Sequence, residues 1–595
     1  MPALKVLLAA ALLTTTALAQ SSSTSDPAAR QHQAEPSTSR PRQPIEPGGS
    51  GITLETSEAL FTIATALNAC GYDTGLQDSA PVRTTVRQSL NEALAASAPA
   101  RDARDALCLY ITQHALANTY TNLGQYISLA LYITPPPALT PTVPETELPP
   151  DSTQVVNILP LLRTFAETTH LHTIYLLSRP AYEAILARVH DPMTRMILDT
   201  NIYLKQPPSA YDNRRFQVLL EPMLAPATTN ARIYGLDYIT VASPLANLSV
   251  RMDEVRHTYL HYTVEPMVYA RANAMERLQP LLKAVQDAPL DYTYKTDVAA
   301  LLTECLIKAI EARTSDLGIP APPRPARGSP RSTQIAYENT VTLYDKQADI
   351  IRRKIIDRDM RQGWVLAEYF YNRLGLMEQD GTTLRDEIGP MVFGMEVERE
   401  AHHAQQVPFF PEGSPEVIST RTRPKRTLSP ADQAELALIK GDREKAEELA
   451  TAILKSDPTN AEAHFLMGRL ELTHNDPVEA QTHFAQVLAV SKDPRTLAWT
   501  HIYLGRLYDT QHNPDTGKLE REKAIAEYKQ ALAVRDAKPD TKLAAEKGLK
   551  EPFALPKREH KTSDDAPDPE DTPLDPSGKA AKDAYKPPPP PSAPK

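Results

Sequence analysis

Two histidines four residues apart are the residues of this chain best placed to do chemistry. His257 and His261 lie in the stretch RHTYLHYTVEP, residues 256–266. Side chains at positions i and i+4 project side by side from one face of a helix. Both imidazoles could therefore reach one Zn²⁺ at about 2.0–2.1 Å. With 15 histidines in the chain, such a pair can also arise by chance, so structural or surface histidines are the alternative.

A third ligand is needed, and Glu304 is the first choice. It lies 43 residues after His261 in a segment, residues 298–310, whose only polar residues are Thr303, Glu304 and Lys308. A helix that is apolar almost all round is expected to be buried. A buried carboxylate is costly unless it is paired or binds a cation. The alternatives are a salt bridge from Glu304 to an arginine or lysine, and Glu265 as the third ligand from the histidine helix itself.

The elements around these residues form a recognisable order. Residues 216–221 alternate partly between apolar and polar and are predicted to form a strand at or near a sheet edge. Residues 231–243 are predicted to form a second strand. The histidine helix then begins near Ser249 and is expected to kink or break at Pro266, and the Glu304 helix follows.

This order of strand, strand, H-x-x-x-H helix and acidic helix resembles the gluzincin group of zinc metallopeptidases. The resemblance implies a zinc ion bound by His257, His261 and Glu304. It also implies a glutamate directly after the first histidine as the general base, but this chain has Thr258 there. A threonine hydroxyl has no useful basicity near neutral pH, and Glu254 is one turn away from the expected position. No residue is therefore predicted to be catalytic, and the domain is interpreted as a pseudoenzyme.

Composition and charge limit the classes of partner and the cellular location expected for the protein. The formal net charge is -10, from 64 Lys+Arg and 74 Asp+Glu, so no broad basic surface and no nucleic-acid partner are expected. Residues 1–19 have one lysine, a short apolar run and a small-x-small end, which is typical of a signal peptide cleaved after Ala19. No later stretch is long enough to span a membrane. The mature protein is therefore expected to be exported, either to the periplasm or as a secreted protein.

Prolines divide the rest of the chain, which has 54 of them. The expected regions are a disordered leader (20–51), a mostly helical α+β metallopeptidase-like region (52–404) with proline-rich breaks near 134–150 and 318–332, a linker (405–429), helical repeats (430–550) and a disordered proline-rich tail (551–595). Three cysteines exclude a full disulfide framework. Cys70 and Cys108 could pair, or could simply be small buried residues.

Residues 441–550 resemble tetratricopeptide repeats, which are 34-residue helix-turn-helix units that stack into an α-solenoid. Small and aromatic residues recur at the expected positions: Gly441, Ala446 and Pro458 in one unit, Ala461, Gly468, Ala480 and Phe484 in the next, and Ala498, Gly505, Tyr508, Ala524, Tyr528 and Ala531 in a third. Residues 541–553 are expected to form a capping helix. The resemblance implies a concave face that binds a protein or an extended peptide.

Two functions follow from these features. In the first, an exported scaffold or protein-binding protein combines the repeats with a gluzincin-like domain that has lost its base. In the second, the protein is a zinc-dependent metallopeptidase with an atypical base, and the repeats capture its substrate. A third interpretation makes the histidines incidental to an unrelated helical domain.

Overall fold

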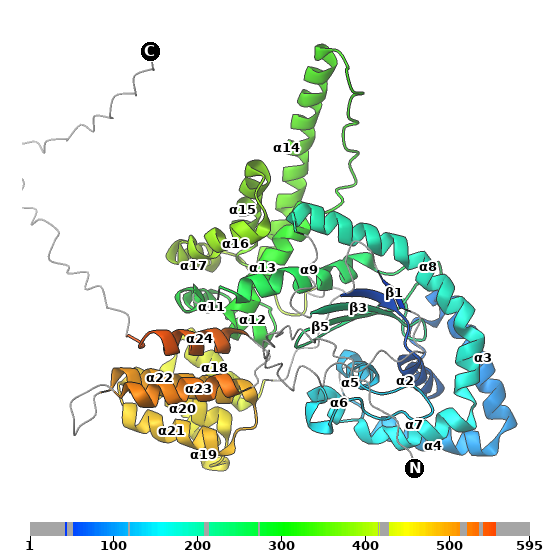
Figure 1. Ribbon diagram of the computed structural model, residues 1–595, viewed down its shortest axis with the longest axis horizontal. Helices are drawn as coiled ribbons and strands as arrows, with labels where there is room; N and C mark the ends of the chain where they lie inside the picture. Colours follow the sequence, from blue (N-terminus) through cyan, green and yellow to red (C-terminus); the bar gives the residue numbers. More distant parts are fainter. Residues whose placement is uncertain are drawn as a thin grey trace, which may run out of the picture.

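The computed structural model is mostly helical and contains one small mixed sheet, which confirms the predicted mostly helical α+β character of the chain (Figure 1). The structure describes residues 42–44, 51–116, 119–206, 214–271, 274–414, 416, 428–511, 520–534 and 539–554. The predicted signal peptide lies outside the described residues, as does most of the leader, linker and tail. Among the described helices, none combines the length and the apolar character needed to cross a membrane.

The sheet has five strands in the order β1-β2-β3-β5-β4. β2, β3 and β5 run parallel, and the outer strands β1 and β4 pair antiparallel to their neighbours. The strands are β1 (Arg42–Pro44), β2 (Ile52–Glu55), β3 (Arg215–Leu220), β4 (Thr229–Tyr234) and β5 (Asp237–Ala242). Three residues of the expected leader thus form a strand.

Two strand predictions were wrong. The segment predicted at or near a sheet edge is β3, which lies in the middle of the sheet between β2 and β5, and the edge strands are β1 and β4. The single strand predicted over residues 231–243 is instead the β4–β5 hairpin, which turns at Gly235 with a φ of 58°. Glycine adopts this left-handed conformation without a steric penalty. β2 lies in a region that was predicted to be helical. The strand was missed because its four residues are all buried and show no alternation in burial.

The first hydrophobic core lies around the sheet and is enclosed by helices from the N-terminal part of the chain. The long helix α8 arches along the outside of this region despite two internal prolines (Figure 1). The main helices are α2 (Glu58–Ala69), α3 (Pro81–Ala96), α4 (Ala98–Gln113), α5 (Thr119–Leu131), α7 (Leu159–Thr168) and α8 (Leu171–Leu204).

A disulfide between Cys70 and Cys108 joins the end of α2 to α4. Beside it, the fully buried Arg83 donates hydrogen bonds to the backbone carbonyls of Tyr72, Thr74 and Leu224. These bonds satisfy the guanidinium group inside the protein. The third cysteine, Cys305, is buried and unpaired.

A second core follows the sheet in sequence and contains the histidine helix α9 (Met252–Tyr269) and the acidic helix α13 (Val298–Arg313). α9 begins at Met252, not after Ser249, and it continues through Pro266 instead of breaking there. Proline cannot donate to the carbonyl of Tyr262, four residues earlier. The Arg214 guanidinium donates to that carbonyl instead.

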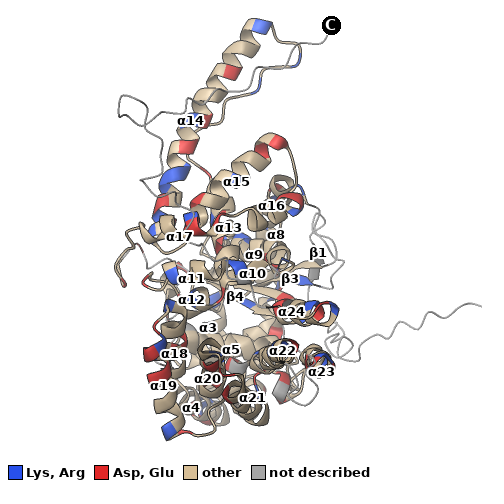
Figure 2. Ribbon diagram, turned by 90° about the vertical axis from the view of Figure 1, so that its left-hand side faces the viewer, with Lys and Arg blue, Asp and Glu red and all other residues tan. Residues whose placement is uncertain are grey.

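The helix α14 (Arg331–Arg361) projects from the body of the molecule (Figures 1 and 2). Its buried residues begin at Ala348, so the first half of the helix has no packed face. Lysine, arginine and acidic residues are interspersed along it (Figure 2). α15 (Ala367–Asp380), α16 (Leu384–Phe393) and α17 (Val397–Gln405) complete the second core.

Seven helices form the C-terminal repeat region. They pack in the pairs α18 with α19, α20 with α21 and α22 with α23, and α24 covers the last pair. Their bounds are α18 (Pro430–Lys440), α19 (Arg443–Ser456), α20 (Ala461–His474), α21 (Pro477–Val490), α22 (Pro494–Thr510), α23 (Arg521–Ala533) and α24 (Pro539–Lys550). The alanines predicted to pack closely at 446, 480 and 524 are fully buried.

Close packing within each pair depends on glycine. A Cβ atom added at Gly468 would lie 2.6 Å from the Phe484 ring, and one at Gly505 would lie 2.7 Å from the Tyr528 ring. We expect Gly468→Ala to lower the free energy of unfolding of the repeat region by about 1–3 kcal/mol because the ring must move. In an unhindered helix the same change stabilises by about 1 kcal/mol. Calorimetry would measure both effects.

Gly389 is the matched control for this substitution. It lies inside α16, and an added Cβ would meet only Arg271 at 3.9 Å, an ordinary contact. The ring of Pro390, the next residue, contacts an alanine Cβ in a helix and offsets part of the gain from losing a glycine, so Gly389→Ala should leave stability close to that of the unchanged protein. Equal stabilisation by both substitutions would contradict the packing described for Gly468.

The disulfide should contribute measurably to the stability of the first core. It closes a loop of 38 residues, and removing such a cross-link costs about 2–4 kcal/mol, mainly because the unfolded chain gains freedom. Cys70→Ala combined with Cys108→Ala should lower the melting temperature as much as a reductant lowers that of the unchanged protein. Cys305→Ala is the control, and its melting temperature should remain sensitive to reductant. If reductant had no effect on the unchanged protein, the disulfide would contribute nothing to stability.

Candidate metal site and an adjoining cavity

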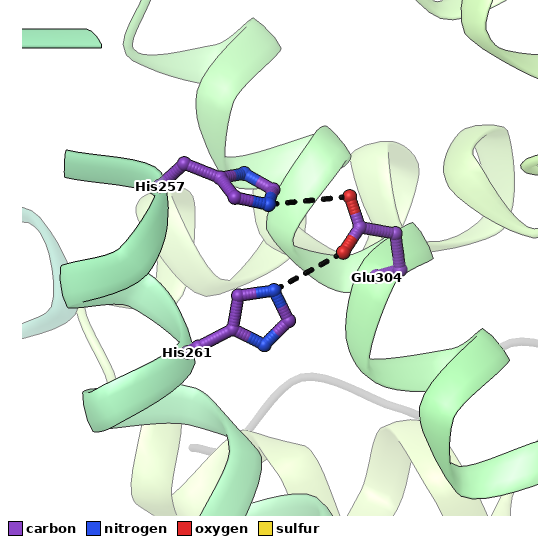
Figure 3. A group of neighbouring side chains, drawn as sticks. All are labelled: His257, His261 and Glu304. Carbon is purple, nitrogen blue, oxygen red and sulfur yellow. Dashed lines mark ion pairs between the residues drawn. The ribbon is translucent and has the colours of Figure 1, made fainter. Parts of the chain in front are cut away.

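The three residues predicted to bind a metal lie together between α9 and α13 (Figure 3). The His257 Nε2 atom lies 3.5 Å from Glu304 Oε1, and the His261 Nε2 atom lies 3.2 Å from Glu304 Oε2. One ligand atom from each residue falls within 4.8 Å of the other two. The two helices pack against each other, and this packing brings the three side chains to one point.

These separations are compatible with a bound cation. Neighbouring ligand atoms in a tetrahedral zinc site with bonds of about 2.0–2.1 Å lie about 3.3 Å apart. The observed separations of 3.5 and 3.2 Å each involve a different oxygen of Glu304 and are also those of ion pairs. The Glu304 Oε2 atom is buried and accepts no hydrogen bond from the residues that the structure describes. Both histidine side chains retain some exposure, 13% for His257 and 15% for His261. The donor set is therefore suited to zinc, and solvent can reach it.

The outer nitrogen of each imidazole faces a second carboxylate. His257 Nδ1 lies 2.9 Å from Glu311 Oε1, and His261 Nδ1 lies 3.4 Å from Glu265 Oε2. Carboxylates in this position orient metal-binding histidines and make them more basic. Glu265, considered above as an alternative third ligand, therefore lies on the outer side of its ring. Glu311 was missed, although it follows Glu304 by seven residues on one helix and so shares its face.

When no metal is bound, the electrostatics of the cluster favours an ionised Glu304 carboxylate beside a protonated His261 imidazole. Burial alone would raise the pKa of Glu304, but His257, His261 and Lys308 hold it well below its ordinary value. Burial alone would lower the pKa of His261, but its contacts with Glu265 and Glu304 raise it to about 9. The salt bridge considered for Glu304 is thus partly present, since Lys308 Nζ lies 3.9 Å away. A metal would have to displace a proton from this site.

Neither candidate for a replacement base is well placed. Thr258 is buried, and its hydroxyl points back along its own helix, 3.4 Å from the Glu254 carbonyl oxygen. The Glu254 carboxylate contacts Arg251 at 3.3 Å, and it lies one helical turn before His257 instead of directly after it. The structure thus brings the three predicted ligands together. The position directly after His257, where the resemblance implies a glutamate base, holds Thr258, which has no carboxylate.

A cavity of about 1020 Å³ lies between the repeat region and the second core. The repeat region contributes residues of α18, α20, α22 and α24, which are the first helices of the pairs and the capping helix. The opposite wall comes from residues 275–299, including Asp297 and Ala299 at the start of α13. Glu304 lies seven residues after Asp297, which is about 10 Å along the helix. One helix therefore links the cavity to the metal site.

The comparisons with known proteins bear on the repeat region alone. Residues 437–500 match the family model described as tetratricopeptide repeat. These residues run from the end of α18 into the start of α22, so this part of the repeat region is similar to tetratricopeptide repeats. Such repeats typically bind proteins, which indicates a protein-binding or scaffold role. No curated protein and no solved structure matches the chain.

The metal site makes a direct prediction. The purified protein should retain about one zinc ion per chain after dialysis, as measured by mass spectrometry, and Glu304→Gln or His261→Ala should abolish this. Glu311→Gln should retain the site but weaken zinc binding by about 10–100-fold, because the imidazole loses its orienting carboxylate.

His402→Ala serves as the control, because His402 is an exposed histidine on α17. Its zinc content should equal that of the unchanged protein. Zinc retained by Glu304→Gln at full stoichiometry would show that the ion binds elsewhere.

Proposed function

We propose that this is an exported scaffold protein whose repeats bind an extended peptide and whose gluzincin-like domain holds zinc without peptidase activity. The observation that carries the proposal is the cavity between the repeats and α13. Its repeat-side wall is formed by the first helices of three successive pairs, and stacked repeats commonly bind their ligands on such a surface. A peptide bound there would lie beside the wall from which the metal-site helix extends.

The proposed zinc ion would be held by His257, His261 and Glu304, with Glu311 and Glu265 orienting the imidazoles. A zinc ion in such a site can polarise a carbonyl group and lower the pKa of bound water. Proton transfer in a peptidase also requires a base, and the Thr258 hydroxyl cannot supply one. The residues present support a role in joining α9 to α13 and stabilising the wall of the cavity.

Export is supported by two independent features. The first nineteen residues have the form of a signal peptide. The Cys70–Cys108 disulfide is of the kind that persists in oxidising compartments such as the periplasm or the extracellular space. Both features are consistent with synthesis for export.

A zinc-dependent peptidase with an atypical base is the second candidate. It is favoured by the partial exposure of both histidines and by the carboxylates of Glu311 and Glu265 within contact of the ligands. These carboxylates face the outer nitrogens of the rings, whereas a base must reach water on the metal. The first candidate therefore accounts better for the arrangement.

One set of assays separates these functions. The full-length protein is incubated with a peptide library, and both cleavage and binding are measured with and without a chelator. We expect binding that Trp499→Ala weakens at least ten-fold, because the indole ring lines the cavity and stacking aromatics dominate such contacts. We expect no cleavage. Leu343→Ala, at an exposed leucine on α14, is the matched control and should bind normally.

Thr258→Glu tests the missing base directly. With zinc content and circular dichroism unchanged, this variant should gain slow cleavage that a chelator abolishes. Chelator-sensitive cleavage by the unchanged protein would instead establish the peptidase, and failure of any peptide to bind would contradict the scaffold function.

A further inference from the structure

The strongest charges in the cavity are already paired with each other. Arg469 Nη1 lies 2.7 Å from both carboxylate oxygens of Glu435. Arg495 makes two parallel contacts with Asp540, at 2.9 and 2.6 Å. Such bidentate pairs are the strong form of the interaction. A ligand that depended on an ion pair with these arginines would have to break an existing pair, so the two pairs disfavour an anionic ligand.

Aromatic rings supply the remaining contact surface. Phe465, Trp499 and Tyr503 line the cavity from the repeat side, and the Trp499 and Phe465 ring centroids lie 6.0 and 5.9 Å from that of Tyr503. Neither the Trp499 indole N–H nor the Tyr503 hydroxyl has a hydrogen-bond partner within the part of the chain that the structure describes. The cavity thus combines aromatic side chains, which the guanidinium groups of Arg469 and Arg506 partly cover, with available donors.

Polyproline is the peptide class that matches this chemistry. A polyproline II helix has no internal hydrogen bonds, so its carbonyl oxygens are free to accept. Its rings pack on aromatic side chains, and because the conformation is preformed, little entropy is lost on binding. A proline run also has no backbone N–H groups that would need acceptors.

The chain itself contains such a segment. The stretch YKPPPPPSAPK, residues 585–595, includes the longest uninterrupted proline run of the sequence, Pro587–Pro591, and lies outside the described residues. The last described residues are in contact with one residue of the cavity lining. The backbone N–H of Phe553 donates to Asp509 at 2.8 Å, and the Phe553 ring lies 4.9 Å from Arg506, a cavity-lining residue.

Length and charge are both compatible with binding of this segment. The residues between 554 and 587 can span up to about 110 Å when extended. This length is ample for a segment that starts beside a cavity-lining residue to enter the cavity. Six acidic and four basic side chains line the cavity, whereas residues 585–595 contain two lysines and no acidic residue. The segment and the cavity are therefore complementary in charge as well as in surface.

We propose that Pro587–Pro591 of the same chain occupy the cavity and compete with external peptides. This inference rests on the proposed peptide-binding function and adds its regulation. A tethered segment has an effective concentration in the millimolar range. An external peptide must therefore bind tightly enough to displace the segment, so the segment excludes weak ligands.

Tryptophan fluorescence tests this in the full-length protein. The chain has two tryptophans, so Trp364→Phe leaves Trp499 as the only one. In that background, substituting serine at all five positions of Pro587–Pro591 should raise acrylamide quenching of Trp499 roughly two-fold or more, because the tethered segment no longer covers the ring. A synthetic peptide of residues 585–595 should reverse this change in the serine variant and have little effect on the parent.

The matched control is serine at four tail prolines outside the run, Pro567, Pro569, Pro573 and Pro576, which should leave quenching unchanged. Equal quenching in the parent and in the five-serine variant would overturn the inference. Should library peptides still bind through Trp499 in that case, the proposed function stands without the regulation. Should no peptide bind, both fall. Quenching that varies with protein concentration would place the segment in a neighbouring copy and overturn occupation within one chain.

Discussion

A carboxylate buried on an apolar helix sets the main constraint on the central part of this protein. Glu304 is only 3% exposed, and every neighbour of it along α13 from Leu301 to Ile307 is fully buried or nearly so. Such a group is tolerated only when positive charge or hydrogen bonds surround it. The two histidines of α9 and Lys308 provide these, so α9 and α13 must pack in one register for the carboxylate to remain ionised.

This constraint also joins the two cores of the molecule. Val255, Tyr259 and Tyr262 on α9 belong to the first core, whereas Leu260 and the buried apolar residues from Val264 to Tyr269 on the same helix belong to the second. His257 and His261 alternate along α9 with these apolar residues, and both contact Glu304 of the neighbouring helix α13. A metal bound there would link α9, which contributes to both cores, to α13, which contributes to the second core. The outer carboxylates Glu311 and Glu265 would fix the two rings in that position.

Sequence reasoning succeeded where the signal is periodic or chemically costly. The repeats recur at a fixed spacing of small and aromatic residues, and Glu304 stands out as a charge in an apolar segment. For the sheet it found β3 but placed it at or near an edge, and it missed β2, which is short and wholly buried. The glycine that turns β4 into β5 was a usable signal.

Other features had no local signal at all. The Glu435–Arg469 and Arg495–Asp540 pairs join residues 34 and 45 positions apart, and only the stacking of helices brings them together. The wall contributed by residues 275–299 depends on how the repeats lie against the second core. The cavity is therefore a property of the tertiary arrangement.

The sharing of α9 between the two cores has a consequence for the order of folding during synthesis. Domains generally fold as units, beginning with the N-terminal one. The first core here includes Tyr262, so it cannot be complete until most of α9 has left the ribosome. That same helix then offers its other side to the second core, whose members extend to Ala404. The two cores are thus successive stages of one folding process, and no cut in the chain could divide them into independent halves without splitting α9.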